Sequence, residues 1–345
     1  MSQALYRTYR PENWDEVKGQ EPIVNALRAS IDASNPAHAY LFAGGRGTGK
    51  TSVARIFARA LGCAPEDMYE IDAASNRGID DIRELREAVR TLPFRSPYKV
   101  YIIDEVHMLT KDSFNALLKT LEEPPAHVIF ILATTEIHKL LDTVVSRCQV
   151  FVFKKPGMEI LKDIVLSVAK TEGYTLDASS AGLIALLGDG SFRDTLGILQ
   201  KVIGASRDKK LSREEVETIT GAPSSQAVND LVSAVAYKDG GKGLSAIASA
   251  KGANVAMDVY AKLVLRMMRV VLLLRFDQSM RPVLAEDFSE DDMAFAETLA
   301  KDVKARINSD TLRAFITANN DIPRAFIPEL PLELALMDCV GGGIS

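Results

Sequence analysis

The chain has 345 residues, of which 47% are apolar and 25% charged, the ordinary balance of a folded globular protein. This length favours about two to three domains. The net charge of −5 does not indicate a polyanionic partner, although a local basic surface could still bind nucleic acid. Three widely separated cysteines without a CxxC pair are typical of a reducing cytosol, so we expect a cytoplasmic protein. The first residues do not resemble a signal peptide, and the longest apolar run, residues 263–276, is broken by three arginines, which excludes secreted and membrane proteins.

The first 155 residues alternate between short apolar runs and amphipathic stretches. The apolar runs predict strands at residues 39–42, 68–71, 99–103, 128–132 and 149–153. Helical periodicity predicts helices at residues 51–61, 80–91 and 111–122. Several of the strands are almost continuously apolar, as strands buried on both faces are. The alternation therefore predicts an α/β domain with a parallel sheet and helices on both of its faces.

Strand signals disappear after residue 155. Helices are predicted first at residues 158–172, 179–187, 192–203 and 211–220, and then, beyond a Gly-Ala-Pro sequence at 221–223, at 259–276, 291–307 and 310–320. Ser212 and Glu215 have the spacing of a capping box. We divide the chain into a nucleotide-binding domain (1–155), a small helical domain (156–221) and an all-α C-terminal domain (222–345).

A glycine-rich segment follows the predicted strand at residues 39–42 and leads into the predicted helix at residues 51–61. It fits the phosphate-loop pattern in full, with the residues Gly44, Gly45, Arg46, Gly47, Thr48, Gly49, Lys50 and Thr51. Backbone N–H groups of such a loop wrap phosphates at the N-terminus of a helix. Lys50 would bind the β- and γ-phosphates, and the Thr51 hydroxyl would ligate Mg²⁺. A glycine-rich turn that matched the pattern by chance would have no reason to lie between a strand and a helix, so the context favours a true phosphate loop.

Two carboxylates, Asp104 and Glu105, end the third predicted strand. Asp104 is placed to hold Mg²⁺ directly or through water, and Glu105 to polarise an attacking water. General-base assistance of this kind is worth ~10²–10⁴-fold in rate. An acidic pair at a strand end could be a surface feature, but the phosphate loop in the same chain favours a role of these carboxylates in nucleotide hydrolysis. Together the two motifs predict an ATP or GTP hydrolase.

The order of these motifs resembles that of the AAA+ clamp-loader ATPases. Ala133-Thr134-Thr135 ends a further strand, and Ser146-Arg147-Cys148 follows it. Residues 6–11, 17–21, 104–109 and 113–125 resemble signatures of the bacterial DNA polymerase III tau/gamma family in particular. The resemblance is dense over residues 1–155 and continues through 190–194, whereas beyond residue 221 it rests on length and helical pattern.

The resemblance implies an AAA+ domain, a helical lid and a C-terminal collar, with ATP and Mg²⁺ as ligands. It places Thr135 at the γ-phosphate sensor, Arg147 at an arginine finger that reaches the neighbouring subunit's nucleotide, and Arg193 at a second sensor. Residues 7–20 would wall the adenine pocket. Without the family, Arg147 could equally be a surface ion-pair arginine, and Arg193 carries even less signal. The collar would hold a ring together, although a monomeric helical bundle fits the sequence of the C-terminal domain as well.

The resemblance also implies partners, namely the other subunits of a hetero-pentameric loader, a sliding clamp and primer–template DNA. Residues 66–81 are acidic and residues 83–99 are basic. Taken alone, the basic run could be a solvated helix face with i,i+4 ion pairs. In the family these helices line the central chamber of the loader. Arg77, Arg83 and Lys119 are therefore candidates to contact the phosphate backbone without reading bases.

The chain departs from the bacterial family after Cys63. The family usually inserts a segment with three more cysteines that hold zinc, and this chain has no such segment. Its four histidines show no ligand spacing, so we expect no zinc site. The departure leaves open a relation to the zinc-free small subunits of archaeal and eukaryotic loaders.

We interpret the chain as an ATPase motor subunit that opens a sliding clamp and releases it on primed DNA after hydrolysis. The alternatives are a small subunit of a replication-factor-C-like loader, a structural loader subunit without hydrolysis, and a Holliday-junction branch-migration motor. Intact Lys50 and Glu105 favour an enzyme. No strand pair is predicted after residue 222, whereas branch-migration motors carry a winged-helix domain. Because the chain stops at Ser345 after a glycine run, we expect it to lack the long extension of the longer bacterial subunit.

Overall fold

The computed structural model describes residues 3–75, 78–206, 208–285 and 288–341. The chain divides into two compact units. Unit 1 comprises Met1–Leu161 and Gly188–Gly197, and unit 2 comprises Lys162–Leu187 and Ile198–Ser345. The division into three domains remains a prediction.

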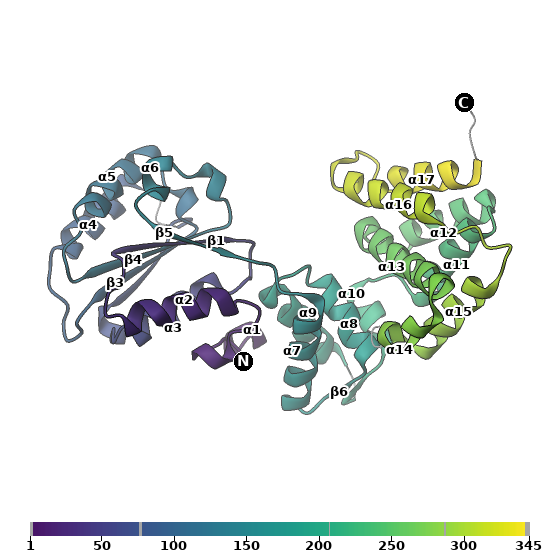
Figure 1. Ribbon diagram of the computed structural model, residues 1–345, viewed down its shortest axis with the longest axis horizontal. Coiled ribbons are helices and arrows are strands. Elements are labelled where there is room, and N and C mark those ends of the chain that lie inside the picture. The colour runs from purple at the N-terminus through teal and green to yellow at the C-terminus, as the bar shows by residue number, and fades with distance from the viewer. Residues whose placement is uncertain (1–2, 76–77, 207, 286–287, 342–345) are drawn as a thin grey trace. The chain divides into compact units, whose positions relative to one another are not determined.

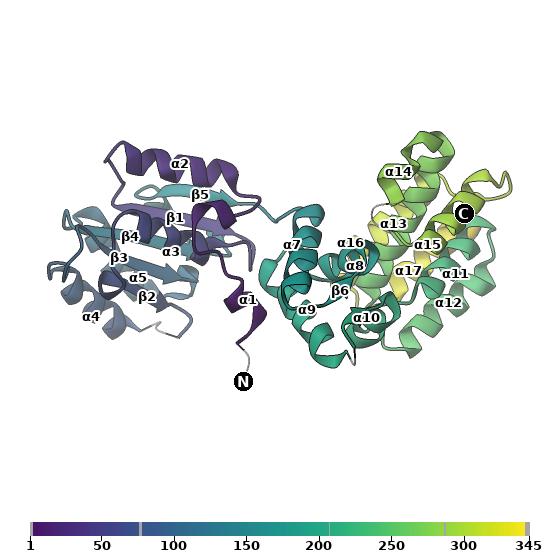
Figure 2. The ribbon, with the colours of Figure 1, turned by 90° about the horizontal axis from the view of Figure 1, so that it is seen from below.

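Unit 1 is built on a five-stranded parallel sheet (Figure 1). The strand order is β2-β3-β4-β1-β5, which can be followed from label to label in Figure 2. Strands β1, β3 and β4 are buried almost from end to end, which explains why they read as continuous apolar runs. Each predicted strand is confirmed to within two residues. Their bounds are β1 (Ala39–Gly44), β2 (Met68–Asp72), β3 (Lys99–Asp104), β4 (Val128–Thr134) and β5 (Gln149–Phe153).

Helices cover both faces of this sheet (Figure 2). Tyr40 and Phe42 pack with helices α2 and α3 on one face, whereas Leu41 packs with α4, α5 and α6 on the other. Successive residues of a strand point to opposite faces, so β1 contributes to both cores. The predicted α/β fold is thereby confirmed. The helices are α1 (Leu5–Thr8), α2 (Glu21–Asp32), α3 (Lys50–Ala60), α4 (Ile79–Val89), α5 (Lys111–Glu122) and α6 (Asp142–Val145).

The carboxyl ends of β1, β3 and β4 meet at one edge of the sheet. The register pairs Ala43 of β1 with Thr134 of β4, and Ile103 of β3 with Leu132 of β4. The three segments that follow these strands are therefore neighbours although they are far apart in sequence. In α/β sheets this edge is the place where ligands bind.

Unit 2 contains one short pair of strands besides its helices. β6 (Thr175–Leu176) and β7 (Lys210–Leu211) pair in parallel. We predicted no strand in this region, because two residues leave no periodic signal. The Ser212–Glu215 capping box is confirmed at the start of α10. The helices from residue 156 to residue 221 are α7 (Met158–Thr171), α8 (Ala178–Leu187), α9 (Phe192–Ala205) and α10 (Arg213–Thr220).

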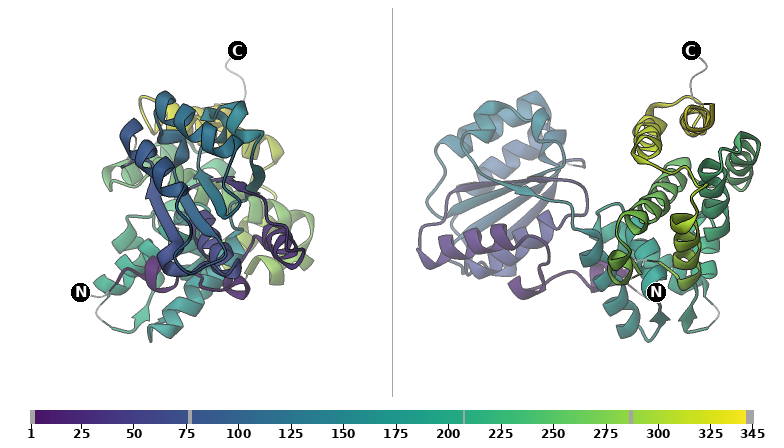
Figure 3. Two further views of the ribbon diagram at one scale, coloured as in Figure 1. Left: turned by 90° about the vertical axis from the view of Figure 1, so that its left-hand side faces the viewer. Right: turned by 45° about the vertical axis from the view of Figure 1, so that its right-hand side comes forward.

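Beyond Ala222 the described residues form helices and connecting turns, which Figure 3 (right) shows in green to yellow. One predicted helix, 291–307, is six residues too long, because α15 ends at Lys301. The guanidinium of Arg275 donates to the carbonyl oxygens of Leu299, Ala300 and Ile307, and so caps the end of α15. Within the described ranges, no helix is both long and apolar enough to cross a bilayer. The longer helices are α11 (Ser225–Ala236), α12 (Gly240–Gly252), α13 (Met257–Phe276), α15 (Glu290–Lys301), α16 (Ser309–Asp321) and α17 (Leu330–Gly341).

We expect Phe130→Ala in β4 to lower the free energy of unfolding of unit 1 by about 3–5 kcal/mol. Phe130 is fully buried, and its ring stacks on that of Tyr101 with 5.6 Å between ring centroids. Trp14, the one tryptophan of the chain, packs against the core of unit 1, so its fluorescence reports denaturant unfolding there. Val152→Ala, at an edge-strand residue that is 63% exposed, is the control. Equal losses in both variants would contradict this account of the core.

Candidate functional site

The loop between β1 and α3 has the backbone of a phosphate loop. Gly44, Gly47 and Gly49 have φ angles of 152°, 69° and 102°, which residues with a side chain rarely adopt. A Cβ atom on Gly47 would lie only 2.0 Å from Ser191 Oγ, and one on Gly44 only 2.5 Å from the carbonyl oxygen of Phe153. Both space and conformation therefore require glycine at Gly44 and Gly47, whereas at Gly49 the requirement is conformational alone.

The other residues of the loop divide between its interior and its surface. Thr48 is buried, and its hydroxyl donates to the carbonyl oxygen of Gly45 at 2.9 Å. Arg46 is exposed. Nothing lies within 4 Å of a Cβ built on Gly49, which precedes the first residue of α3. The first backbone N–H groups of a helix have no partner within the helix, so the N-terminus of α3 can bind an anion.

Lys50 and Thr51 begin α3 with their side chains directed at the loop and at β3. Lys50 Nζ donates to the carbonyl oxygens of Gly44 and Gly45, both at 2.8 Å. Burial lowers the pKa of the Lys50 ammonium below its ordinary value, whereas the nearby carboxylates of Glu105 and Asp104 act in the opposite direction. The predicted phosphate-binding lysine and both predicted acids are thus brought together.

Thr51 and Asp104 fit a magnesium ion. Thr51 Oγ1 donates to Asp104 Oδ2 at 2.8 Å, so a hydroxyl oxygen and a carboxylate oxygen lie side by side. Mg²⁺ prefers oxygen ligands and is usually held by one or two protein groups together with substrate phosphates. Among the residues that the structure describes, no three His, Cys, Asp or Glu side chains gather as a metal site. The expected lack of zinc stays a prediction.

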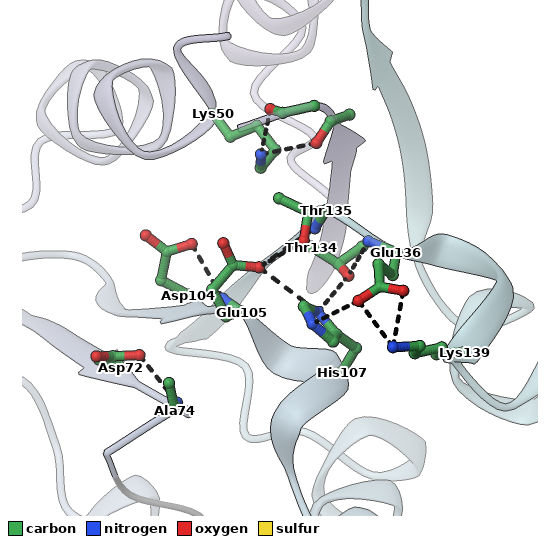
Figure 4. Close-up of polar contacts among 12 residues, drawn as sticks. Lys50, Asp72, Ala74, Asp104, Glu105, His107, Thr134, Thr135, Glu136 and Lys139 are labelled. Carbon is green, nitrogen blue, oxygen red and sulfur yellow. Dashed lines mark hydrogen bonds and ion pairs between the residues drawn. The ribbon is translucent and has the colours of Figure 1, made fainter. Parts of the chain in front are cut away.

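Glu105 is held in contact with the predicted sensor residue (Figure 4). Its Oε2 accepts hydrogen bonds from the backbone N–H and from Oγ1 of Thr135, at 3.3 and 3.0 Å. Its own backbone N–H donates to Asp104 Oδ1 at 3.0 Å. Glu105 has a φ of 48°, a left-handed conformation that costs a non-glycine residue ~1–3 kcal/mol and is concentrated at functional sites.

His107 belongs to this cluster, although sequence reasoning did not select it. It lies in a short 3₁₀ helix, Val106–Met108, and its side chain is 6% exposed. Nδ1 lies 2.9 Å from Thr134 Oγ1 and 3.5 Å from Glu105 Oε2. Nε2 lies 3.4 Å from a carboxylate oxygen of Glu136. The spacing of the four histidines argues only against zinc, and a single histidine after a strand leaves no spacing signal for a polar cluster.

Arg193, the predicted second sensor, lies in unit 1 near the phosphate loop. The N–H of Phe192, the first residue of α9, donates to the carbonyl oxygen of Gly47 at 3.0 Å. The guanidinium carbon of Arg193 lies 5.7 Å from the centroid of the Tyr6 ring. The charge of Arg193 also contributes to the lowered pKa of Lys50, which places both cations in the same neighbourhood.

The predicted adenine wall, residues 7–20, contacts the phosphate loop and α3 through hydrogen bonds. Arg10 Nε donates to Ser52 Oγ at 2.9 Å. Gln20 is buried, and its amide donates to the carbonyl oxygens of Lys154 at 2.8 Å and Thr48 at 3.4 Å. The segment is therefore fixed to the loop and to the residue after β5.

Arg147 has partners away from the phosphate loop. Its guanidinium donates to a carboxylate oxygen of Glu122 and to the carbonyl oxygen of Thr143, both at 2.7 Å. About a third of the Arg147 side chain is exposed, 34%. Glu122 ends α5, so this ion pair joins α5 to the residues after α6. The action of Arg147 on a neighbouring subunit stays a prediction.

The three candidate DNA contacts are described to different extents. Lys119 is exposed on α5. Arg83 falls within the bounds of α4, but its side chain lies outside the described part of the chain, and Arg77 lies outside the described residues altogether.

Comparison with known sequences relates the chain to subunits of DNA polymerase III. Residues 19–77 and 66–157 match a family model described as DNA polymerase III, delta subunit. The chain is 44% identical over 258 residues to DNA polymerase III subunit tau of Bacillus subtilis, covering 69% of this chain and 46% of that protein. Over 273 residues it is 38% identical to subunit tau of Escherichia coli, covering 72% and 42%. The chain thus spans just under half the length of these curated relatives.

Comparison with solved structures concerns the fold alone. The Holliday junction branch migration motor RuvB of Thermotoga maritima aligns with a TM-score of 0.53 and 20% identity, covering 66% of this chain and 79% of that one. A point variant of that protein aligns with a TM-score of 0.53 and 18% identity over 85% of this chain and 90% of the other. The AAA+ fold expected from the motifs is confirmed.

We expect Gly47→Ala to weaken binding of a fluorescent ATP analogue by about tenfold or more. The new Cβ would lie 2.0 Å from Ser191 Oγ, and overpacking of this kind costs roughly 1–3 kcal/mol. Removing the clashing hydroxyl with Ser191→Ala in the same chain is expected to restore part of the affinity. Gly197→Ala is the control, because a Cβ there has nothing within 4 Å. Unchanged affinity in Gly47→Ala would contradict the assigned role of the loop.

Proposed function

Because the chain is a relative of the DNA polymerase III tau and gamma/tau subunits and has an AAA+ fold, we propose that it is an ATPase motor subunit of a clamp loader. It uses ATP binding and hydrolysis to open a sliding clamp and to load it onto primed template DNA in the cytoplasm. The observation that carries this proposal is the convergence of Lys50, Thr51, Asp104 and Glu105 at one edge of the sheet.

Each group at this edge has a defined task in the proposed reaction. The glycine-rich loop and Lys50 bind the phosphates, while Thr51 and Asp104 hold Mg²⁺, which neutralises charge on the phosphates when bound. Glu105 orients the attacking water and accepts its proton. Thr135 senses the γ-phosphate, and its two hydrogen bonds to Glu105 connect that sensing to the base.

The proposal includes assembly with other loader subunits. Arg147 acts on the nucleotide of a neighbouring subunit, where such an arginine is worth ~10³–10⁵ in rate. Arg193 acts on the nucleotide of its own chain, which its position beside the phosphate loop supports. A hetero-pentamer is the assembly that the family resemblance favours. The delta-subunit description of the matching family model supports membership of such a complex.

Primer–template DNA is a proposed partner through its phosphate backbone. Arg77, Arg83 and Lys119 are the proposed contacts, and the exposure of Lys119 is compatible with this role. Backbone contacts recognise the shape of a primed junction without reading its sequence. A chain of net charge −5 can do this because the contacts are local.

We expect Lys50→Ala and Arg147→Ala each to abolish the stimulation of ATP turnover by clamp and primed DNA in the assembled loader. Lys50→Ala removes phosphate binding, whereas Arg147→Ala is expected to lower kcat by ~10³-fold or more with ATP binding to its own site retained. Lys242→Ala is the control, because this lysine of α12 is 81% exposed and lies outside the basic run at residues 83–99. Tight ATP binding without turnover under every combination would contradict the motor and favour a structural subunit.

We expect Lys119→Ala to weaken DNA binding by the loader to a similar extent on unrelated sequences. Loss of one phosphate contact reduces the slope of log K against log salt by about 1. Fluorescence anisotropy over a series of salt concentrations measures this slope. Lys242→Ala, at an 81% exposed lysine of α12, is the control. An unchanged slope in Lys119→Ala would remove Lys119 from the DNA-binding surface.

A further inference from the structure

A closed set of polar contacts surrounds His107 and includes the proposed base. The Glu136 backbone N–H donates to Thr134 Oγ1 at 3.0 Å, and Thr134 Oγ1 lies 2.9 Å from His107 Nδ1. The other ring nitrogen lies 3.4 Å from the Glu136 carboxylate. His107 therefore contacts both the first and the last residue of the segment 134–136, whose middle residue, Thr135, binds Glu105.

A carboxylate lies near each ring nitrogen of His107. A carboxylate only accepts hydrogen bonds, so either contact becomes a hydrogen bond when the nitrogen that faces the carboxylate carries a proton. Nδ1 faces Thr134 Oγ1, with Glu105 Oε2 at 3.5 Å on the same side. The ring thus lies with one nitrogen toward Glu105 and the other toward Glu136.

The other described histidines lack this combination. His127 Nε2 faces the backbone carbonyl oxygens of Val89 and Thr91, which is a structural arrangement between two connecting segments. His138 also lies near Glu136, at 3.6 Å, but its side chain is 75% exposed. Burial together with contact to the catalytic carboxylate is what distinguishes His107 from them.

We propose that His107 is a positioning residue that couples the orientation of the Glu105 carboxylate to the segment 134–136 after β4. This inference rests on the proposed function, in which Glu105 is the general base and Thr135 senses the γ-phosphate. A shift of the segment on nucleotide binding then reaches Glu105 through two connections, the direct bonds from Thr135 and the ring of His107.

Histidine ring-nitrogen NMR tests the coupling without any need for turnover. The chain has four histidines, so a histidine-labelled sample gives few signals, and those lost in His107→Gln are assigned to His107. We expect Glu105→Gln to move the Nδ1 resonance and Glu136→Gln to move the Nε2 resonance. Glu122→Gln, which changes the partner of Arg147, is the control and is expected to leave both in place. An unmoved His107 in Glu105→Gln overturns the proposal.

Kinetics of the assembled loader test the positioning role. His107→Asn retains a polar group near the Nδ1 position and loses the reach to Glu136, whereas His107→Gln has the opposite pattern. Because the coupling needs both ends, each variant is expected to lower kcat between about 10- and 100-fold, while KM for ATP changes by less than about twofold. His138→Ala, which removes the exposed histidine beside Glu136, is expected to retain wild-type kcat.

The outcomes separate this inference from the function on which it rests. Wild-type kcat in both His107 variants overturns the positioning role, even if the resonances respond as expected. A parallel loss of ATP affinity and of folded structure, measured by thermal unfolding, also overturns it in favour of a purely structural histidine. A wild-type loader that never turns over ATP contradicts the proposed function, and the NMR measurement then still decides whether His107 and Glu105 are coupled.

Discussion

The parallel register of β3, β4 and β1 is the constraint on which the candidate site depends. β4 is buried along its whole length between its two neighbours, so its position cannot slip without exposing apolar residues. With this register fixed, the phosphate loop after β1, the acids after β3 and the threonines after β4 necessarily meet. The chemistry resides in short connecting segments, and the apolar sheet sets their distances.

Cations gather at this edge although the chain as a whole is acidic. Burial lowers the pKa of both Lys50 and Arg10, and the charge of Arg193 lowers each of them further. Mutual repulsion of this kind is relieved by an anion placed among the three groups. Asp104 and Glu105 provide part of that compensation, and the phosphates of a nucleotide would provide more. The local electrostatic potential at this edge, rather than the net charge of −5, therefore governs the binding of an anionic ligand.

The sequence predicted those features whose physical cause is local. The phosphate loop was recognisable because Gly47 and Gly49 satisfy backbone requirements that few other residues meet. The end of α15 was misplaced because its cap comes from Arg275, a side chain on another helix. The role of His107 was missed for the same reason, since its partners follow a different strand. The predicted task of Arg147 depends on a second chain and stays a prediction.

The ion pair between Arg147 and Glu122 has a consequence for how such subunits join. Because Arg147 is paired with Glu122 in its own chain, its charge is already compensated before a neighbouring subunit binds. If Arg147 acts in trans, its engagement exchanges one anion for another, a carboxylate within its own chain for a phosphate on the neighbour. A neighbour without nucleotide has no phosphate to replace the Glu122 carboxylate as the partner of Arg147. This contact therefore discriminates between neighbours with and without bound nucleotide. Subunit recognition would then report nucleotide occupancy before any bond is cleaved.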